Sequence, residues 1–457
     1  MQILVTLALV VIAVLLFELI IGLHEFGHFI TAKLSGIKVN EFALGMGPKL
    51  FSFKKGETQY SLRLLPIGGY CAMEGEDEDS PEPCSFNNAK VWKRMIVIIA
   101  GAVMNIILGI IFSFIMVIPQ EAYSSTTIDQ FDPRSYSANS GLQEGDKIIK
   151  VNGYDIYNSK DLSFSFAGVS CENVDGKSVS VYKEDCANAI CTEYSKIVTE
   201  KELNDDTILN LYNITTEGCK EVNSSTDKST AQSVMNKTVE ELYKAVGVAD
   251  FTLPTITEKE TRQRYTATVT VIRDGKELEL EDVQFFTYYK SEEDKEADKP
   301  SVSLDFYVEP IEKTFTSVIT QGFSESVSVG RMVWQSLVWI VEGRFGFKDM
   351  SGPVGIASAV TQVASQGLET NFGSAVFNIL NVMTLITINL GIFNMLPFPA
   401  LDGGRFLLLL IEWIFRKPIP RKVEKYINAA GFVILMVFMI VITCKDVWQL
   451  FTGQLSL

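Results

Sequence analysis

The sequence predicts a polytopic α-helical membrane protein with about four transmembrane helices, a small membrane-associated β-hairpin or sheet, and an extracytoplasmic α+β domain. Three observations predict this class. The 457-residue chain is 47% hydrophobic yet 21% charged, which indicates membrane and water-exposed parts in one polypeptide. Its apolar residues gather in several runs long enough to cross a bilayer. A long acidic stretch separates the second run from the third.

We place the crossings at residues 1–34, 91–119, 373–404 and 427–457. Each holds an apolar run close to the length of about 20 residues that a bilayer requires. The run Phe406–Phe415 is apolar but too short to span, and Glu412 interrupts it. We therefore expect a short cytoplasmic-side helix and loop at 405–426.

Basic residues predict the orientation of the spans. Lysines and arginines are frequent in residues 35–90 and again in 405–426, which places both loops in the cytoplasm. Residues 120–312 and both termini then lie outside, in a multi-pass protein of the cell membrane. The first segment lacks a basic start and a small-residue cleavage site, so we expect a span and not a cleaved signal peptide.

The charge of the chain argues against one class of partner. The formal net charge is −15, and the acidic excess lies mainly in the external part. No basic groove that would suit a nucleic acid is visible in the sequence. We expect no nucleic-acid partner and interpret the acidic residues as a solvated surface.

The first span carries His24-Glu25-Phe26-Gly27-His28 near its end. Residues four apart share a helix face, so His24 and His28 can bind one metal ion with Glu25 beside it as a general base. These are the only two histidines in the chain. A chance match with satisfied core histidines is the alternative, but ionisable groups at the inner end of a span favour a functional metal site.

Residues 35–90 follow the metal motif and alternate enough to predict short strands around the Lys54–Glu57 turn. A plain surface hairpin is the simpler interpretation. Because the region adjoins the metal motif, we also expect a sheet edge at which an extended substrate can pair. An acidic loop closes this region.

The third span ends in Asn394-Met395-Leu396-Pro397-Phe398-Pro399-Ala400-Leu401-Asp402-Gly403-Gly404. Its prolines and glycine pair break the helix, and exposed backbone at membrane depth is tolerated only where protein or water lines it. The predicted topology brings Asp402 to the same side as the histidines, where it completes a His, His, carboxylate set with one open position. Glu41 is the competing third ligand.

The external region contains Gly141-Leu142-x-x-Gly-Asp-x-Ile-x-x-x-Asn152-Gly153, which resembles the peptide-binding core of a PDZ domain. Its second half arrives only near residues 265–286, so about 167–264 is an insertion. Four external cysteines lie in this insertion, and they leave open two disulfides, metal binding or free thiols: Cys171, Cys186, Cys191 and Cys219.

Residues 313–372 predict amphipathic helices on the outer face of the membrane. A fifth, shallow crossing is the alternative, but Glu325 and Arg331 would then enter the bilayer.

Together, the helix-borne HEFGH, the NMLPFPALDGG segment, the PDZ-like core and Gly352-Pro353-Val354-Gly355-Ile356 resemble the site-2 family of intramembrane zinc metalloproteases, in its bacterial PDZ-containing class. The likeness covers nearly the whole chain except the insertion. It implies that Glu25 is catalytic, that zinc is bound by His24, His28 and Asp402, and that the substrate site is shaped by Asn394, Pro397 and Pro399. It also implies that Asn105 faces this site; without the resemblance, helix packing is the favoured explanation of Asn105.

The resemblance implies a zinc-dependent endopeptidase that cuts transmembrane segments of single-span proteins inside the bilayer, after a first external cut. Membrane anti-sigma factors and remnant signal peptides are the implied substrates. Two other classes of function remain as alternatives. One is a non-proteolytic membrane scaffold with PDZ peptide binding and a structural zinc. The other is a metal transporter, for which the spans hold few polar residues.

Overall fold

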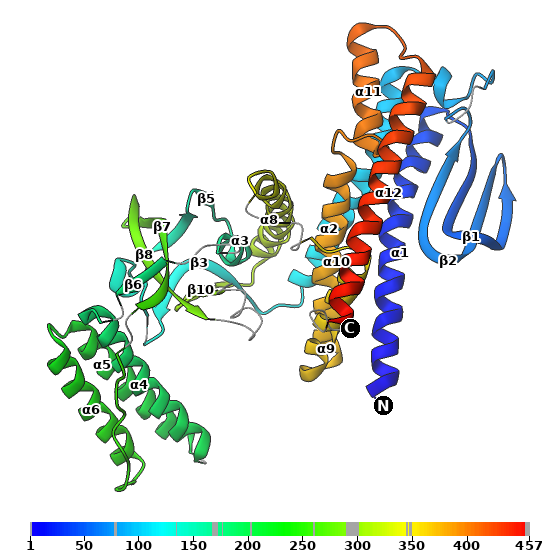
Figure 1. Cartoon of the computed structure of the whole chain (residues 1–457). Coiled ribbons are helices and arrows are strands. Elements are labelled where there is room, and N and C mark those ends of the chain that lie inside the picture. Colours follow the sequence, from blue (N-terminus) through cyan, green and yellow to red (C-terminus); the bar gives the residue numbers. More distant parts are fainter. Residues whose placement is uncertain are drawn as a thin grey trace. The chain divides into compact units, whose positions relative to one another are not determined.

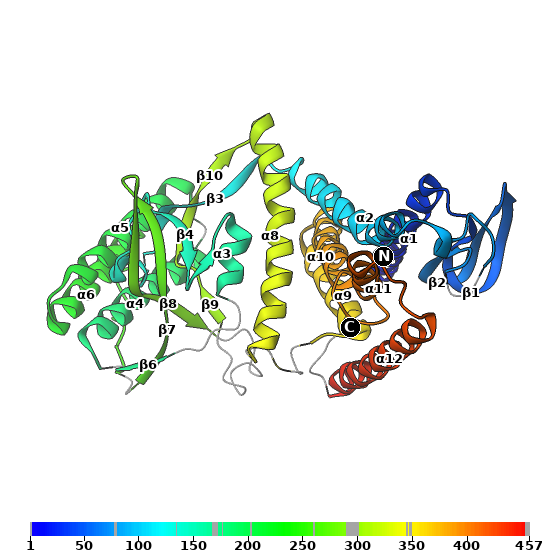
Figure 2. The ribbon, with the colours of Figure 1, turned by 90° about the horizontal axis from the view of Figure 1, so that it is seen from above.

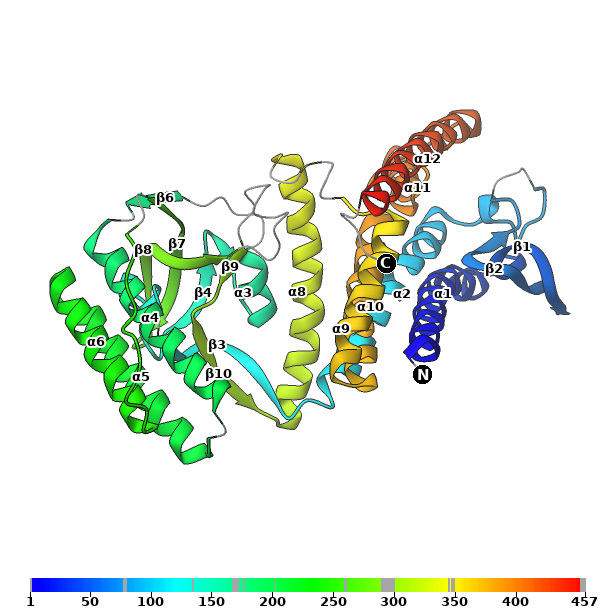
Figure 3. The same cartoon turned by 60° about the horizontal axis from the view of Figure 1, so that its bottom comes forward.

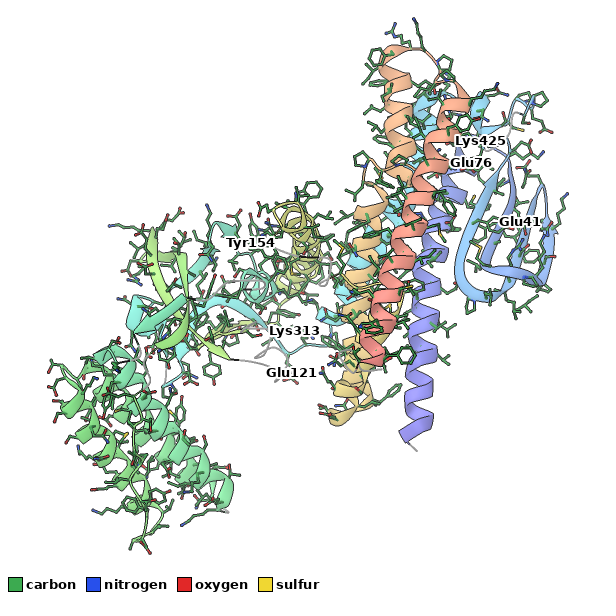
Figure 4. The ribbon with its side chains drawn as sticks, in the orientation of Figure 1. Glu41, Glu76, Glu121, Tyr154, Lys313 and Lys425 are labelled. Carbon is green, nitrogen blue, oxygen red and sulfur yellow. The ribbon has the colours of Figure 1, made fainter. Side chains whose placement is uncertain are left out.

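The computed structural model describes residues 2–76, 80–133, 135–166, 172–175, 177–201, 203–258, 261–288, 301–343, 346 and 350–452. The chain divides into two compact units. One unit contains the residues up to Glu121 together with those from Lys313 onward, and the other is Ala122–Glu312. Figure 4 labels Glu121 and Lys313, where the chain passes between the units.

Four helices in the described residues are long and apolar enough to cross a membrane. They are α1 (Gln2–Ser35), α2 (Val91–Val117), α10 (Phe372–Asn394) and α12 (Arg421–Phe451). This agrees with the predicted multi-pass fold. The third of these helices ends at Asn394, earlier than the predicted span 373–404, because a turn over residues 395–401 separates it from α11 (Asp402–Phe415).

Helix α2 lies at the centre of this unit. It packs against α1, α10, α11 and α8 (Phe315–Val341), and α9 (Pro353–Thr370) packs on α10. Figure 1 shows that the axes of α1, α2 and α10 are roughly aligned, and Figure 2 shows α2 between α1 and α10. The helix has no charged residue after Arg94, so its apolar length can be buried on several sides.

Glycines bring α1 and α2 unusually close together. A Cβ at Gly27 of α1 would overlap the carbonyl oxygen of Ala100 of α2. A Cβ at Gly101 of α2 would overlap His28 Nε2 and lie 2.7 Å from His24 Cε1. Both positions therefore require glycine, and the contact puts the backbone of α2 directly against the two imidazoles.

The predicted strands after α1 form a doubled hairpin. Strand β1 (Val39–Lys55) and strand β2 (Thr58–Met73) pair antiparallel, and both strands bend back on themselves. Residues 41–44 pair with 69–72 on one side and with 59–62 on the other. Glycines at φ of about +80° allow these bends, among them Gly45 and Gly47. The segment 69–73 has no further strand partner in the described part of the chain.

The second unit combines a sheet with a helical bundle. The sheet order is β10-β3-β4-β7-β8-β9, with β5 paired to β4 and β6 paired to β7. Their bounds are β3 (Ala122–Phe131), β4 (Lys147–Val151), β5 (Tyr154–Asp155), β6 (Glu172–Asp175), β7 (Thr261–Arg273), β8 (Lys276–Tyr288), β9 (Ser301–Ser303) and β10 (Phe306–Glu312). The predicted strand, Asn-Gly turn and strand correspond to β4, Asn152-Gly153 and β5.

Helix α3 (Ser159–Ser165) ends just before the insertion, whose helices are α4 (Val179–Glu200), α5 (Asp205–Ser224) and α6 (Lys228–Ala245). Figure 3 shows this bundle in green. Each helix begins after a capping residue whose side chain accepts from the main chain three residues on: Ser178, Asn204 and Asp227. The bundle has its own core, which includes Ile190, Leu211, Met235 and Leu242.

No disulfide joins two cysteines in the described part of the chain. In the insertion, Cys191 Sγ and Cys219 Sγ lie 3.8 Å apart in the core of the bundle, and Cys186 is also buried there. Cys171, the fourth cysteine of the predicted set, lies outside the described residues.

A buried ion pair attaches the helical bundle to the sheet. Arg264 of β7 pairs with Glu184 of α4, and the side chains are only 3% and 8% exposed. The Arg264 guanidinium also lies over the Tyr136 ring, 4.0 Å from its centroid.

Replacing Arg264 by methionine should destabilise the second unit by about 3–5 kcal/mol, because Glu184 then stays buried without its partner charge. Denaturant unfolding of the full-length protein followed by pulse proteolysis measures this. Lys228→Met is the matched control. It removes an exposed pair with Glu258 at 2.8 Å, which contributes about 0–1 kcal/mol. If the two substitutions have equal effects, the buried pair does not have the stabilising role given to it here. The same follows if the Arg264→Met/Glu184→Leu double variant does not recover stability.

Candidate metal centre

His24 and His28 lie on the α1 face that meets α2 and are 7% and 9% exposed. Their Nε2 atoms lie 3.2 Å apart. Asp402 Oδ2 lies 3.2 Å from His24 Nε2 and 3.4 Å from His28 Nε2. Two residues of α1 and one of α11 thus converge on one point, and they form the one group with metal-binding potential found among the described residues.

The spacing of these three atoms fits zinc. Ligands about 2.0–2.1 Å from a tetrahedral zinc ion lie about 3.3 Å from each other. The observed triangle of two imidazole nitrogens and one carboxylate oxygen has sides of 3.2, 3.2 and 3.4 Å. Two neutral imidazoles and a carboxylate are also a donor set that zinc accepts, with a fourth position left for water.

Asp402 reaches the histidines because of the turn that precedes it. Ala400 has a φ of +73°, and Asp402 is the first residue of α11. A Cβ at Gly403 would overlap the Leu396 carbonyl oxygen, and one at Gly404 would overlap that of Phe398. The Asp-Gly-Gly sequence therefore lets the turn fold tightly onto the helix start, where a carboxylate is also favoured by the helix dipole.

Two ion pairs hold α11 in place. Arg94 at the start of α2 contacts Glu412 of α11 at 2.6 Å. Arg405, three residues after Asp402, pairs with Glu76, which follows the hairpin. Figure 4 labels Glu76. The sequence indicated neither pair, because each joins residues more than 300 positions apart.

The outer ring nitrogens of the two imidazoles also have partners. His28 Nδ1 lies 2.8 Å from the Val97 carbonyl oxygen, so it donates its hydrogen there. His24 Nδ1 lies 3.2 Å from Asn105 Nδ2, and Asn105 is fully buried. In His28, fixing Nδ1–H in this way leaves Nε2 free to bind a metal. Val97 and Gly101 were not recognised in the sequence, although both share the helix face of Asn105.

Asn394 also lies at the centre. Its Nδ2 is 3.4 Å from His24 Nε2, on the side that faces Asp402. Pro397, which was expected beside it, lines an apolar cavity of about 480 Å³ between α2, α10 and Trp334 of α8. Pro399 packs against Gly431 of α12. The structure therefore brings Asn394 to the metal ligands, whereas Pro397 lines the cavity and Pro399 packs against α12.

Glu25 faces the doubled hairpin. A Cβ built at Gly69 would lie 3.4 Å from Glu25 Cγ, so the strand segment 69–73 passes directly beside this carboxylate. Glu25 is half-buried, unlike the two histidines that flank it.

Glu41, the competing third ligand, is bound within the hairpin. Its carboxylate accepts from Ser61 at 2.6 Å and contacts Lys49 at 3.1 Å and Arg63 at 3.2 Å. Partial burial acts to raise the pKa of Glu41, but hydrogen bonds from Ser61, Lys49, Tyr70 and Arg63 outweigh it and lower the pKa to about 2. Figure 4 labels Glu41 in the hairpin. It is not in the group that contains Asp402.

Comparison with known proteins shows the family. Residues 12–438 match peptidase family M50. A putative zinc metalloprotease of Clostridium acetobutylicum is 30% identical, over 96% of this chain and 97% of the relative. The regulator of sigma-W protease RasP of Bacillus subtilis is 30% identical, over 97% of this chain and 99% of the relative. The resemblance seen in the sequence is thereby confirmed: this protein is a membrane metalloprotease that belongs to peptidase family M50.

Proposed function

We propose that this enzyme is a zinc-dependent intramembrane endopeptidase that cleaves transmembrane segments of single-span proteins. The observation that carries the proposal is the triangle of His24, His28 and Asp402 at the end of an apolar helix, with Glu25 beside it. Relatives named zinc metalloprotease match nearly the whole chain, which supports zinc as the metal.

Each residue of the centre has a distinct role in this proposal. Bound zinc supplies Lewis-acid activation of the attacking water and of the scissile carbonyl. Glu25 takes a proton from that water and returns it to the leaving amine. The Asn394 carboxamide donates a hydrogen bond to the oxyanion that develops on the substrate carbonyl. Its position 3.4 Å from His24 Nε2 supports this role.

A substrate helix must unwind before it can be cut, because its carbonyl groups are hydrogen-bonded within the helix. The doubled hairpin offers a way to hold the unwound chain. Segment 69–73 passes beside Glu25, and its outer edge has no strand partner in the described residues. An extended substrate that pairs with this edge would lie next to the general base.

We further propose that the natural substrates are membrane anti-sigma factors or remnant signal peptides that have already been cut outside the membrane. The RasP relative is named as a regulator of sigma-W protease, which supports the first class. The unit Ala122–Glu312, with its PDZ-like core, would lie outside the cytoplasm and exclude intact proteins by size. The basic residues of the short loops support a position of the metal centre near the cytoplasmic side of the cell membrane.

Glu25→Gln should lower the rate of cleavage of a single-span substrate by about 10²–10⁴-fold, because the variant has no general base. Its zinc content should stay the same, since Glu25 is not among the ligands. Reconstituted protein and a gel-based cleavage assay measure this. Glu18→Gln, an acid-to-amide change on the same helix, is the control and should retain activity. Unimpaired cutting by a zinc-loaded Glu25→Gln variant would favour the non-proteolytic scaffold.

Asp402→Ala should weaken zinc binding by more than about 100-fold, because one of three protein ligands is lost. Competition with a zinc chelator measures the affinity. Glu41→Gln is the matched control and should bind zinc like the wild type, since its carboxylate is engaged by Lys49 and Arg63. If Glu41→Gln weakens zinc binding and Asp402→Ala does not, the assignment of Asp402 as the third ligand is wrong.

A substrate trimmed to a short external segment should be cut at least several-fold faster than the same substrate with its folded external domain, because the second unit would bar the larger molecule. Replacing residues 122–312 by a short flexible linker should remove this difference. Equal rates for the two substrates with the wild-type enzyme would contradict size exclusion.

A further inference from the structure

One face of α2 contacts both histidines. Val97, Gly101 and Asn105 are four residues apart, so they form a stripe along this helix. Gly101 faces both imidazoles at a distance that only a glycine allows. Val97 offers its carbonyl oxygen to His28 Nδ1, and Asn105 offers its carboxamide to His24 Nδ1.

Asn105 lies where α2 packs against α10. The residue is fully buried, and its backbone carbonyl accepts a hydrogen bond from Thr387 Oγ1 of α10 at 3.1 Å. This bond ties α2 to α10 at the level of the metal centre. Asn105 Nδ2 is the atom that faces His24 Nδ1, and the buried Oδ1 has no hydrogen-bond partner among the described residues. A half-turn of the amide exchanges oxygen and nitrogen and gives Oδ1 the Nδ1–H group as a donor.

The carboxamide lies behind His24 and not in front of it. His24 Nε2 points to His28 and Asp402, and Asn394 approaches on that same side. Asn105 meets Nδ1, on the opposite edge of the ring. A substrate carbonyl must approach the Nε2 side, where the three ligand atoms converge, so Asn394 is the better placed of the two amides for contact with substrate.

We infer that Asn105 is a positioning residue that accepts a hydrogen bond from His24 Nδ1–H, and that its removal frees the ring to rotate and to change tautomer. With Oδ1 facing the ring, the amide fixes the tautomer whose Nε2 carries the lone pair for the metal. The Val97 carbonyl does the same for His28. The inference rests on the proposed metal site, and it makes the AGAVMN stretch of α2 part of the centre.

The chemistry of the two acceptors predicts an asymmetry between the histidines. Val97 acts through its main chain, so no side-chain substitution there removes the hydrogen bond to His28. Asn105 acts through its side chain, so the hydrogen bond to His24 can be deleted by mutation. Asn105→Leu removes the acceptor, whereas Asn105→Asp keeps an acceptor oxygen of similar shape but cannot donate to a substrate.

The test measures zinc affinity of the full-length protein by chelator competition. Asn105→Leu should bind zinc about 10–100-fold more weakly than the wild type, the usual effect of losing the hydrogen-bond partner of a metal-bound histidine. Asn105→Asp should bind zinc at least as tightly as the wild type. Asn378→Leu is the matched control. It deletes another amide of a spanning helix, bonded to the Val363 carbonyl at 3.0 Å, and should leave the affinity unchanged.

A second readout follows from the histidine count. Because the chain has two histidines, protein with ¹⁵N-labelled histidine gives nitrogen signals from only two imidazoles. In the zinc-loaded wild type, both rings should show a protonated Nδ1. In Asn105→Leu, the His24 signals should shift or broaden while those of His28 keep their positions.

Wild-type zinc affinity in a folded Asn105→Leu variant would overturn the inference. Loss of activity in both Asn105 variants with zinc affinity intact would overturn it as well, and would assign the amide to the oxyanion. The His24→Ala variant distinguishes failure of the Asn105 inference from failure of the proposed function. If that variant binds zinc like the wild type, the metal site itself is wrong, whatever the Asn105 variants do.

Discussion

The close contact between α1 and α2 is the constraint on which the rest of the centre depends. Buried polar groups without partners cost roughly 2–7 kcal/mol in an apolar setting. Here both outer imidazole nitrogens lie against polar groups of α2, which is possible because Gly27 and Gly101 lack the side chains that would keep the helices apart. The same contact turns both Nε2 atoms toward a single point. The packing of α1 against α2 therefore also fixes the geometry of the two imidazole ligands.

The position of the Asp402 carboxylate depends on a different feature, the turn between α10 and α11. The turn between α10 and α11 gives up helical hydrogen bonds so that Asp402 can begin a new helix beside the histidines. Its backbone conformation is specified by the tight fit of Gly403 and Gly404 against the turn. The Arg94–Glu412 contact then ties the new helix back to α2. Helix α2 thus contacts the elements that carry all three ligands, and it contributes no ligand itself.

Much of this could be predicted from the sequence, because the strongest signals are local. Apolar length identified the spans, and helical spacing paired His24 with His28. Asp402 followed from a helix break and a topology argument. The structure brings it to the histidines and leaves Glu41 in its own network, which no local pattern indicated. Val97 was missed because its contribution is a main-chain carbonyl, and the Arg405–Glu76 pair because it joins distant residues.

The fold of the insertion was not predicted either. Its helices have weak overall hydrophobicity, and only the stripe that includes Met235, Val239 and Leu242 reveals a buried face. The doubled hairpin was predicted as simple strands, because pairing of 41–44 on both sides depends on bends at glycines and not on alternation. The insertion helices and the doubled hairpin both depend on contacts between residues that are distant in sequence. A single sequence contains little information about such contacts.

The central claim is that two imidazoles and one carboxylate hold zinc at this contact. X-ray absorption at the zinc edge, on the purified full-length protein, tests it most directly. We expect only nitrogen and oxygen ligands, at about 2.0–2.2 Å from the zinc ion, together with the outer-shell scattering of two imidazole rings. A sulfur ligand at about 2.3 Å, or a spectrum without imidazole scattering, would contradict it.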